Sequence, residues 1–286
     1  MIIANPIYDV VFKYLLDDTD IARELLSTIL GEDIVSLELK PQETATENLS
    51  GNISILRFDF KAVIKMPSGN TKKVLIELQK AKQVFDVSRF RKYLGDNYRK
   101  EDDVLNHEGV SEKRPLPIIT IYFLGFRLDN IQNAAVKINR EYRDAFTQEL
   151  LEVREDFVEL LTHDSYLIQI PLLKTATKTK LERVLQVFSP VFKTKDEHQL
   201  DFRGDANDLL VKKIIDRLGR AIASDEMRDV MDLEDEIDRV FERGIKRAEA
   251  EKDKIIAEKD QELEAERQKN EELLRQIAEL KNQVNK

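Results

Sequence analysis

The chain has 286 residues, no cysteine and a formal net charge of −9 at pH 7. This length allows one full-sized domain and an appendage. The absence of cysteine excludes a disulfide framework and thiolate zinc sites, which fits a reducing cytoplasm. No stretch approaches the roughly 20 apolar residues of a membrane span, and the N-terminus lacks a secretion signal, so we expect a cytoplasmic protein without a membrane partner.

The negative charge is concentrated near one end of the sequence. Acidic side chains outnumber basic ones in residues 225–286, which leaves residues 1–224 close to neutral. Overall acidity therefore does not exclude a nucleic-acid partner for residues 1–224, because local basic clusters decide whether a phosphate backbone can be held.

The first 40 residues predict two helices followed by a strand. Apolar residues recur at helical spacing from about residue 7 to 15 and again from about 20 to 30, where Gly31 is a natural stop. Residues 34–40 alternate as a strand does. These elements favour an α/β fold.

Two apolar stretches, at about 53–65 and 72–79, predict an antiparallel hairpin around a Pro-Ser-Gly-Asn turn. Each carries one carboxylate, Asp59 or Glu77, where an apolar residue would cost less to bury. If the turn is centred on Ser68, the two carboxylates lie directly opposite each other on one face, because side chains on a strand alternate. A loop longer by one residue would put them on opposite faces.

The position of the two carboxylates favours a metal site. Carboxylates about 5 Å apart across a strand pair repel each other unless a cation lies between them, and Mg²⁺ prefers such hard oxygen ligands. Gln79 joins the same face two residues after Glu77. The alternative is an exposed hairpin face on which Asp59 pairs with Lys61 or Lys73. The apolar residues of both strands point to the other side: Phe58, Phe60, Val74, Ile76 and Leu78.

The next stretch, about residues 83–107, predicts a helix with an apolar stripe and a basic face. A basic face is often only solvated, but one that follows two candidate metal ligands also suits a DNA backbone, because Lys and Arg supply most non-specific DNA affinity. We therefore predict DNA contacts from the basic side chains in and just before this helix: Lys80, Lys82, Arg89, Arg91, Lys92 and Arg99.

The remaining part of residues 1–224 predicts further strands and helices. After a turn at 112–115, the run 116–126 is continuously apolar and predicts a buried central strand beside the hairpin. Residues 165–171 predict an edge strand, and 178–189 and 207–223 predict amphipathic helices.

From about Leu233 the sequence predicts a long helix without proline, so we divide the chain into residues 1–224 and an acidic tail, 225–286. The seam of its heptads is poor at first and good from Asn270 onward, which predicts a parallel coiled-coil homodimer; a single charged helix is the alternative. Position a falls on Glu249, Ile256, Leu263, Asn270, Ile277 and Val284, and position d on Lys252, Lys259, Glu266, Leu273 and Leu280.

Four ordered motifs resemble a known family. They lie at residues 5–16 (NPIYDVVFKYLL), 57–60 (RFDF), 76–79 (IELQ) and 89–94 (RFRKYL). Together they are similar to the PD-(D/E)XK nuclease family transposases, also described as recombination-promoting nucleases, over about residues 1–130. The resemblance implies a restriction-endonuclease-like core, in which helices flank a mixed sheet, a DNA substrate and a bacterial cytoplasmic setting.

The resemblance also implies roles for individual residues. Asp59 and Glu77 would bind Mg²⁺, with Mn²⁺ as an alternative, and the Leu78 carbonyl would be a further ligand. Gln79 occupies the position of the superfamily's catalytic lysine, and an amide can only orient water or substrate, because it neither carries charge nor titrates. Lys61, on the Asp59 face, would supply the missing charge.

Asp9 in the first helix also matches the family pattern, which implies an auxiliary role at the metal or in positioning water. From spacing alone, Asp9 and Lys13 would form a surface ion pair. The leading hypothesis is a Mg²⁺-dependent DNA endonuclease of the recombination-promoting nuclease type. Because Gln79 departs from the family pattern, the alternative is a catalytically degenerate DNA-binding or assembly protein that dimerises through its C-terminal helix.

Overall fold

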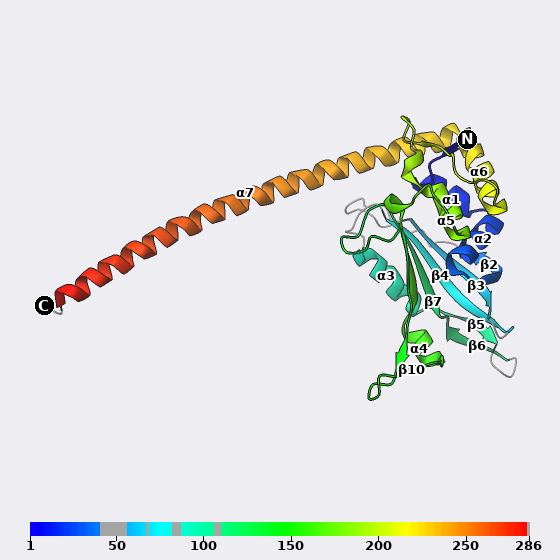
Figure 1. The fold of residues 1–286 in the computed structure, drawn as a ribbon, viewed down its shortest axis with the longest axis horizontal. Helices are drawn as coiled ribbons and strands as arrows, with labels where there is room; N and C mark the ends of the chain where they lie inside the picture. The colour runs from blue at the N-terminus through cyan, green and yellow to red at the C-terminus, as the bar shows by residue number, and fades with distance from the viewer. Residues whose placement is uncertain (41–55, 67–68, 82–86, 106–109, 285–286) are drawn as a thin grey trace. The chain divides into compact units, whose positions relative to one another are not determined.

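The computed structural model describes residues 1–40, 56–66, 69–81, 87–105 and 110–284. Contacts divide the chain into two units, Met1–Leu233 and Glu234–Lys286. The first unit is an α/β structure built on a six-stranded sheet with the order β2-β3-β4-β7-β11-β8 (Figure 1). The predicted α/β class, with a mixed sheet and a long C-terminal helix, is confirmed.

The sheet is mixed, with parallel strands in the middle and antiparallel pairs towards both edges. Its strands are β2 (Asp33–Leu39), β3 (Leu56–Lys65), β4 (Thr71–Ala81), β7 (Ile118–Leu124), β8 (Ala135–Ile138) and β11 (Asp164–Gln169). Strands β2, β3 and β4 are antiparallel, whereas β7 runs parallel to both β4 and β11. The expectation that β11 lies at an edge is wrong, because β8 pairs with its outer side.

One face of the sheet carries the main core. The helices that pack there are α1 (Asp9–Leu16), α2 (Thr19–Leu30), α5 (Lys180–Leu185) and α6 (Leu209–Ala221) (Figure 1). Phe12 of α1 lies 6.1 Å from Phe58 and 5.2 Å from Phe123 between ring centroids, so aromatic contacts join α1 to β3 and β7. Helix α2 ends as predicted at Gly31, whose φ of 70° favours glycine.

The other face lies under α3 (Val87–Tyr98) and the hairpin of β5 (Glu101–Leu105) and β6 (Ser111–Pro115). Leu94 and Tyr98 of α3 pack against Leu75 and Ile118. The helix predicted over 83–107 is therefore too long at its C-terminal end, and the predicted turn at 112–115 is a strand. Residues 101–105 instead pair with 111–115, and Asp102 of β5 forms an ion pair with Lys61 of the sheet.

Several short elements were not predicted. They are β1 (Ile2–Ala4) paired with β12 (Gln199–Asp201), β9 (Tyr142–Arg143) paired with β10 (Leu150–Leu151), α4 (Asp156–Leu161), and the 3₁₀ turns η2 (Ile170–Leu172), η3 (Gln186–Phe188) and η4 (Pro190–Phe192). The helix predicted over 178–189 is divided between α5 and η3. Such short segments carry too few residues for a periodic pattern.

The C-terminal helix α7 (Asp225–Val284) begins before Leu233, the residue from which the long helix was predicted. Four apolar side chains at its predicted a and d positions are exposed: Ile256, Leu263, Leu273 and Ile277. The side chains of Leu280 and Val284 lie outside the described residues. Within the described ranges, no helix combines the length and apolar character that a membrane span requires.

Candidate active site

The hairpin register brings the two predicted carboxylates together. In the ladder of β3 and β4, Asp59 is paired with Glu77, and the last pair before the turn joins Lys65 to Thr71. The predicted register is therefore confirmed, although Ser68 itself lies outside the described residues. Both carboxylates point to the face covered by α3, since the intervening Phe58 and Leu78 belong to the main core.

This carboxylate face is buried. Glu77 and Gln79 are 0% exposed, and Asp59 is 8% exposed. The alternative of an exposed face with Asp59 paired to a lysine is wrong. The ammonium of Lys61 lies 2.7 Å from Asp102 and that of Lys73 3.5 Å from the same side chain.

Arg57 provides the counter-charge to both carboxylates. Its Nε lies 3.0 Å from Asp59 Oδ1 and 3.7 Å from Glu77 Oε1. Its Nη2 also donates to Asp59 Oδ2. The guanidinium therefore bridges the two strands at the position where the sequence predicted a metal ion.

Asn97 of α3 forms hydrogen bonds with all three charged side chains of the cluster. Its Nδ2 donates to Asp59 Oδ1 at 3.3 Å and to Glu77 Oε2 at 3.2 Å, while its Oδ1 accepts from Arg57 Nη2 at 3.3 Å. The sequence interpretation missed both Arg57 and Asn97. Each carried a local signal, because Arg57 is two residues from Asp59 on the same strand and Asn97 is three residues after the half-buried Leu94 on the helix.

Burial raises the pKa of Glu77 to about 7, against the opposing charge of Arg57. The neighbouring Asp59 raises the same pKa further. Gln79 Nε2 donates to Glu77 Oε1, which leaves Gln79 Oε1 buried without a hydrogen-bond partner among the described residues. A buried amide oxygen without a protein partner carries a desolvation cost, which a water molecule or a ligand would offset.

These oxygen atoms fit a hard divalent cation. Asp59, Glu77 and the Oε1 of Gln79 gather on one face, and Mg²⁺ is typically held by one or two carboxylates with water and substrate completing its shell. Within the described ranges, no three acidic or histidine side chains form a metal cluster, so the protein alone offers a partial shell. Leu78 directs its side chain into the main core, which leaves only its backbone near the pair.

Asp9 and Lys80 lie on the opposite face of the sheet from Asp59 and Glu77. Lys80 is 1% exposed and follows Gln79 directly, so its side chain points towards α1. Its ammonium lies 2.5 Å from Asp9 and donates to the carbonyl of Ile7. The structure therefore does not bring Asp9 to the carboxylate pair, and it separates Lys80 from the predicted basic face.

The predicted DNA-contact residues are only partly gathered on α3. Arg91, Lys92 and Arg99 are exposed along one side of the helix, although Arg99 is paired with Asp96 at 2.6 Å. The side chain of Arg89 and the whole of Lys82 lie outside the described residues. We therefore keep Arg91, Lys92 and Arg99 as the basic face of α3.

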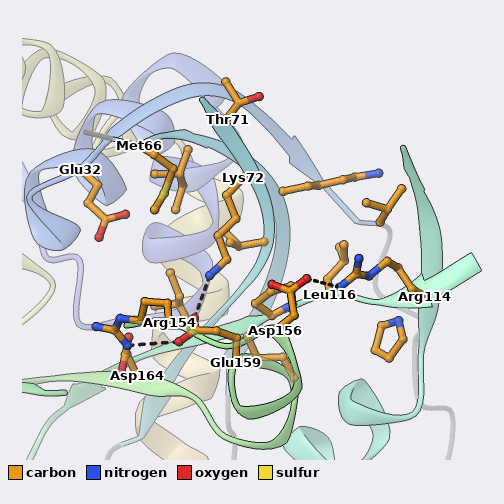
Figure 2. Close-up of a pocket in the computed structure, with 18 of the residues that line it drawn as sticks. Glu32, Met66, Thr71, Lys72, Arg114, Leu116, Arg154, Asp156, Glu159 and Asp164 are labelled. Atoms are coloured by element: carbon orange, nitrogen blue, oxygen red, sulfur yellow. Dashed lines mark hydrogen bonds and ion pairs between the residues drawn. The ribbon is translucent and has the colours of Figure 1, made fainter. Parts of the chain in front are cut away.

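A second candidate is a cavity of about 400 Å³ lined by the first residues of β4 and β7 (Figure 2). Lys72 and Glu159 point towards each other in it and form an ion pair at 2.8 Å. Glu159 also accepts hydrogen bonds from Arg140 at 3.0 Å and Arg154 at 3.2 Å. These charges already satisfy one another, so the cavity offers a structural ion-pair network that fixes α4 to the sheet.

Glu159 should make the stability of the protein depend on acid pH. Burial alone would raise its pKa, but the hydrogen bond from Lys72 and the charges of Lys72 and Arg140 outweigh burial and lower it to about 2. Because the folded pKa lies below the unfolded one, this stabilisation is present above the unfolded value of 4.5 and is lost as pH falls towards 2.

We therefore expect Glu159→Gln to reduce the free energy of unfolding at pH 7, and the difference from wild type to shrink by about 2 kcal/mol between pH 6 and pH 2.5. Urea unfolding over this pH range measures it. The matched control is Glu152→Gln, which removes an exposed carboxylate nearby. A difference that stays constant with pH would contradict the assigned role of Glu159.

Comparison of the chain with protein-family models, with curated proteins and with solved structures finds no match.

Proposed function

We propose that this protein is a Mg²⁺-dependent DNA endonuclease of the recombination-promoting nuclease type, with a restriction-endonuclease-like core. The observation that carries the proposal is the hairpin register, which sets Asp59 opposite Glu77 and beside the unpaired oxygen of Gln79. The mixed sheet between two helical layers and the four ordered motifs support it. Asp102 on β5 also has a buried oxygen without a hydrogen bond among the described residues, but Lys61 and Lys73 form ion pairs with that carboxylate.

Asp59, Glu77 and Gln79 Oε1 would hold Mg²⁺, or Mn²⁺ in its place. A bound divalent cation supplies a Lewis acid for the scissile phosphate and a more acidic water. Asn97 orients both carboxylates, and Gln79 orients water by hydrogen bonding, because an amide does not titrate. Lys61 lies on the same face, but it can reach substrate only by leaving Asp102.

Helix α3 covers Glu77, because Glu77 and Asn97 are buried between β4 and α3. Asp59 is 8% exposed. A phosphate group would therefore approach the carboxylate pair from the side of Asp59.

The basic face of α3 would hold the DNA backbone. We expect the double variant Arg91→Ala/Lys92→Ala to weaken binding to every sequence and to reduce the slope of log K against log salt by about 0.9 for each phosphate that is no longer neutralised. Fluorescence anisotropy with a labelled duplex at several salt concentrations measures both. Lys174→Ala, an exposed lysine outside α3, is the control. An unchanged slope would mean that the basic face is only solvated.

Helix α7 would join two copies of the chain as a parallel coiled coil. Four of its exposed apolar residues, Ile256, Leu263, Leu273 and Ile277, fall on the predicted seam, and Asn270 at an a position favours two parallel strands. A dimer would present two nuclease sites to the two strands of one duplex.

Deleting residues 265–286 should convert a dimer into a monomer, because the strongest part of the seam begins at Asn270. The double variant Leu273→Glu/Ile277→Glu should do the same, since charges would face each other across the seam. Gln268→Glu, at an outward f position, is the matched control. Light scattering at tens of micromolar gives the mass, and a truncated chain that stays dimeric would place the interface elsewhere.

The alternative function is a catalytically degenerate DNA-binding or assembly protein. It is favoured by Arg57, which neutralises the carboxylate pair without a metal, and by Gln79 at the position of the family's lysine. Nicking of supercoiled plasmid by the purified full chain separates the two proposals. Cleavage that requires Mg²⁺ or Mn²⁺ supports the nuclease, whereas binding without cleavage under either metal supports the alternative.

A further inference from the structure

We infer that Arg57 is a built-in competitor of the divalent cation, so that its guanidinium sets how tightly the Asp59–Glu77 pair binds metal. This inference rests on the proposed function, because it concerns the same two carboxylates. It adds a residue that the family motifs did not assign to the site.

The geometry places the guanidinium on the atoms that a metal would need. Arg57 donates to both oxygens of Asp59, and its Nε also lies 3.7 Å from Glu77 Oε1. The remaining Glu77 oxygen, Oε2, accepts from Asn97. A cation bound between the strands must therefore displace Arg57 from at least one carboxylate before it gains a full pair of ligands.

Because both are positively charged, the Arg57 guanidinium and a divalent cation cannot occupy the site together. When Asp59 and Glu77 are both ionised, one guanidinium leaves the cluster one negative charge, whereas a dication neutralises it. A dication beside a retained guanidinium would put like charges within a few ångströms in a buried site, which is strongly unfavourable. The metal ion and Arg57 therefore compete for the same carboxylate oxygens.

Arg57 can leave while the carboxylates stay. Its side chain is 18% exposed, whereas that of Glu77 is 0% exposed. The guanidinium can thus turn towards solvent, where a phosphate group offers the same bidentate geometry as a carboxylate. Because Glu77 remains fixed by Asn97 and Gln79, the oxygen ligands keep their positions during the exchange.

The test is Mn²⁺ binding by isothermal titration calorimetry on the full chain with Arg57→Gln. We expect the Kd for Mn²⁺ to fall by at least about tenfold, because charge-assisted hydrogen bonds no longer have to be broken. In EDTA the variant should unfold at a lower temperature than wild type, and Mn²⁺ should restore its melting temperature by a larger shift than in wild type.

Lys65→Gln is the matched control. It removes one positive charge from the same strand and the same face, roughly 20 Å from Asp59 along the strand, and should leave the Kd unchanged. Asp59→Asn should abolish binding in either background. If Arg57→Gln is too unstable to purify, Arg57→Lys replaces the fork by a point charge and should give an intermediate Kd.

Three outcomes overturn the inference. An Arg57→Gln protein that melts lower but binds Mn²⁺ no more tightly than wild type would show that Arg57 only stabilises the fold. If wild type also cleaves plasmid, the nuclease proposal survives that result. If neither wild type nor Arg57→Gln binds Mn²⁺ and neither cleaves, the carboxylate pair is not a metal site and both proposals fail. If Lys65→Gln lowers the Kd for Mn²⁺ as much as Arg57→Gln does, the effect arises from net charge and not from the contacts of Arg57.

Discussion

Asp59→Asn and Glu77→Gln should each lower Mg²⁺-dependent plasmid nicking by more than about 100-fold, because loss of even an outer partner of a metal ligand commonly costs about 10–100-fold. Both substitutions keep the shape of the side chain and remove its charge. The fold should survive Glu77→Gln, since burial raises the pKa of Glu77 to about 7 and a neutral group suits that position. Gln79→Ala should have a smaller effect, because it removes one neutral oxygen.

The measurement is the rate of nicking across a range of Mg²⁺ and Mn²⁺ concentrations, with circular dichroism to confirm folding. Glu38→Gln is the matched control, because it removes an exposed carboxylate from the neighbouring strand β2. If both carboxylate variants cleave at the wild-type rate, Asp59 and Glu77 do not carry catalysis. If the two variants cleave only at high Mn²⁺ concentration, Asp59 and Glu77 are metal ligands whose main contribution is to metal affinity.

The hairpin was predictable because two local rules act together. Strand alternation fixes which side chains share a face, and the turn fixes the register, so Asp59 and Glu77 could be paired from their numbers alone. The same alternation places Lys80 and Gln79 on opposite faces of the sheet. Grouping Lys80 with the basic face of the next helix ignored that rule, and its burial against α1 is the consequence.

The boundaries of α3 were not predictable from periodicity. Apolar spacing continues to Tyr98, but the charged run that follows it neither breaks a helix nor predicts a strand. Residues 101–105 pair with β6, and Asp102 forms ion pairs with Lys61 and Lys73 of the sheet. Sequence alone does not show which distant cation an acidic residue will meet.

The occupant of the carboxylate pair was also beyond sequence reasoning. Strand spacing predicted that a cation must lie between Asp59 and Glu77, and the structure supplies Arg57 in that place. Arg57 is paired with Gln79 in the ladder, so Glu77 is its diagonal neighbour on the adjacent strand and lies within reach of a long side chain. A metal ion and an arginine can each neutralise the two carboxylates. Which of them binds the pair more tightly is therefore measured with Arg57 variants.

Asp9→Ala should destabilise the protein by about 3 kcal/mol, because it leaves the buried ammonium of Lys80 without its carboxylate. Lys80→Met should cost less, since it replaces the buried cation by an apolar side chain near Phe12. Asp9→Ala should then cost little more in the Lys80→Met background, and urea unfolding of the four proteins gives this coupling. Binding of Mn²⁺ should be unchanged in all of them. If Asp9→Ala instead keeps its stability and loses Mn²⁺ binding, Asp9 acts at the metal, as the family resemblance implies.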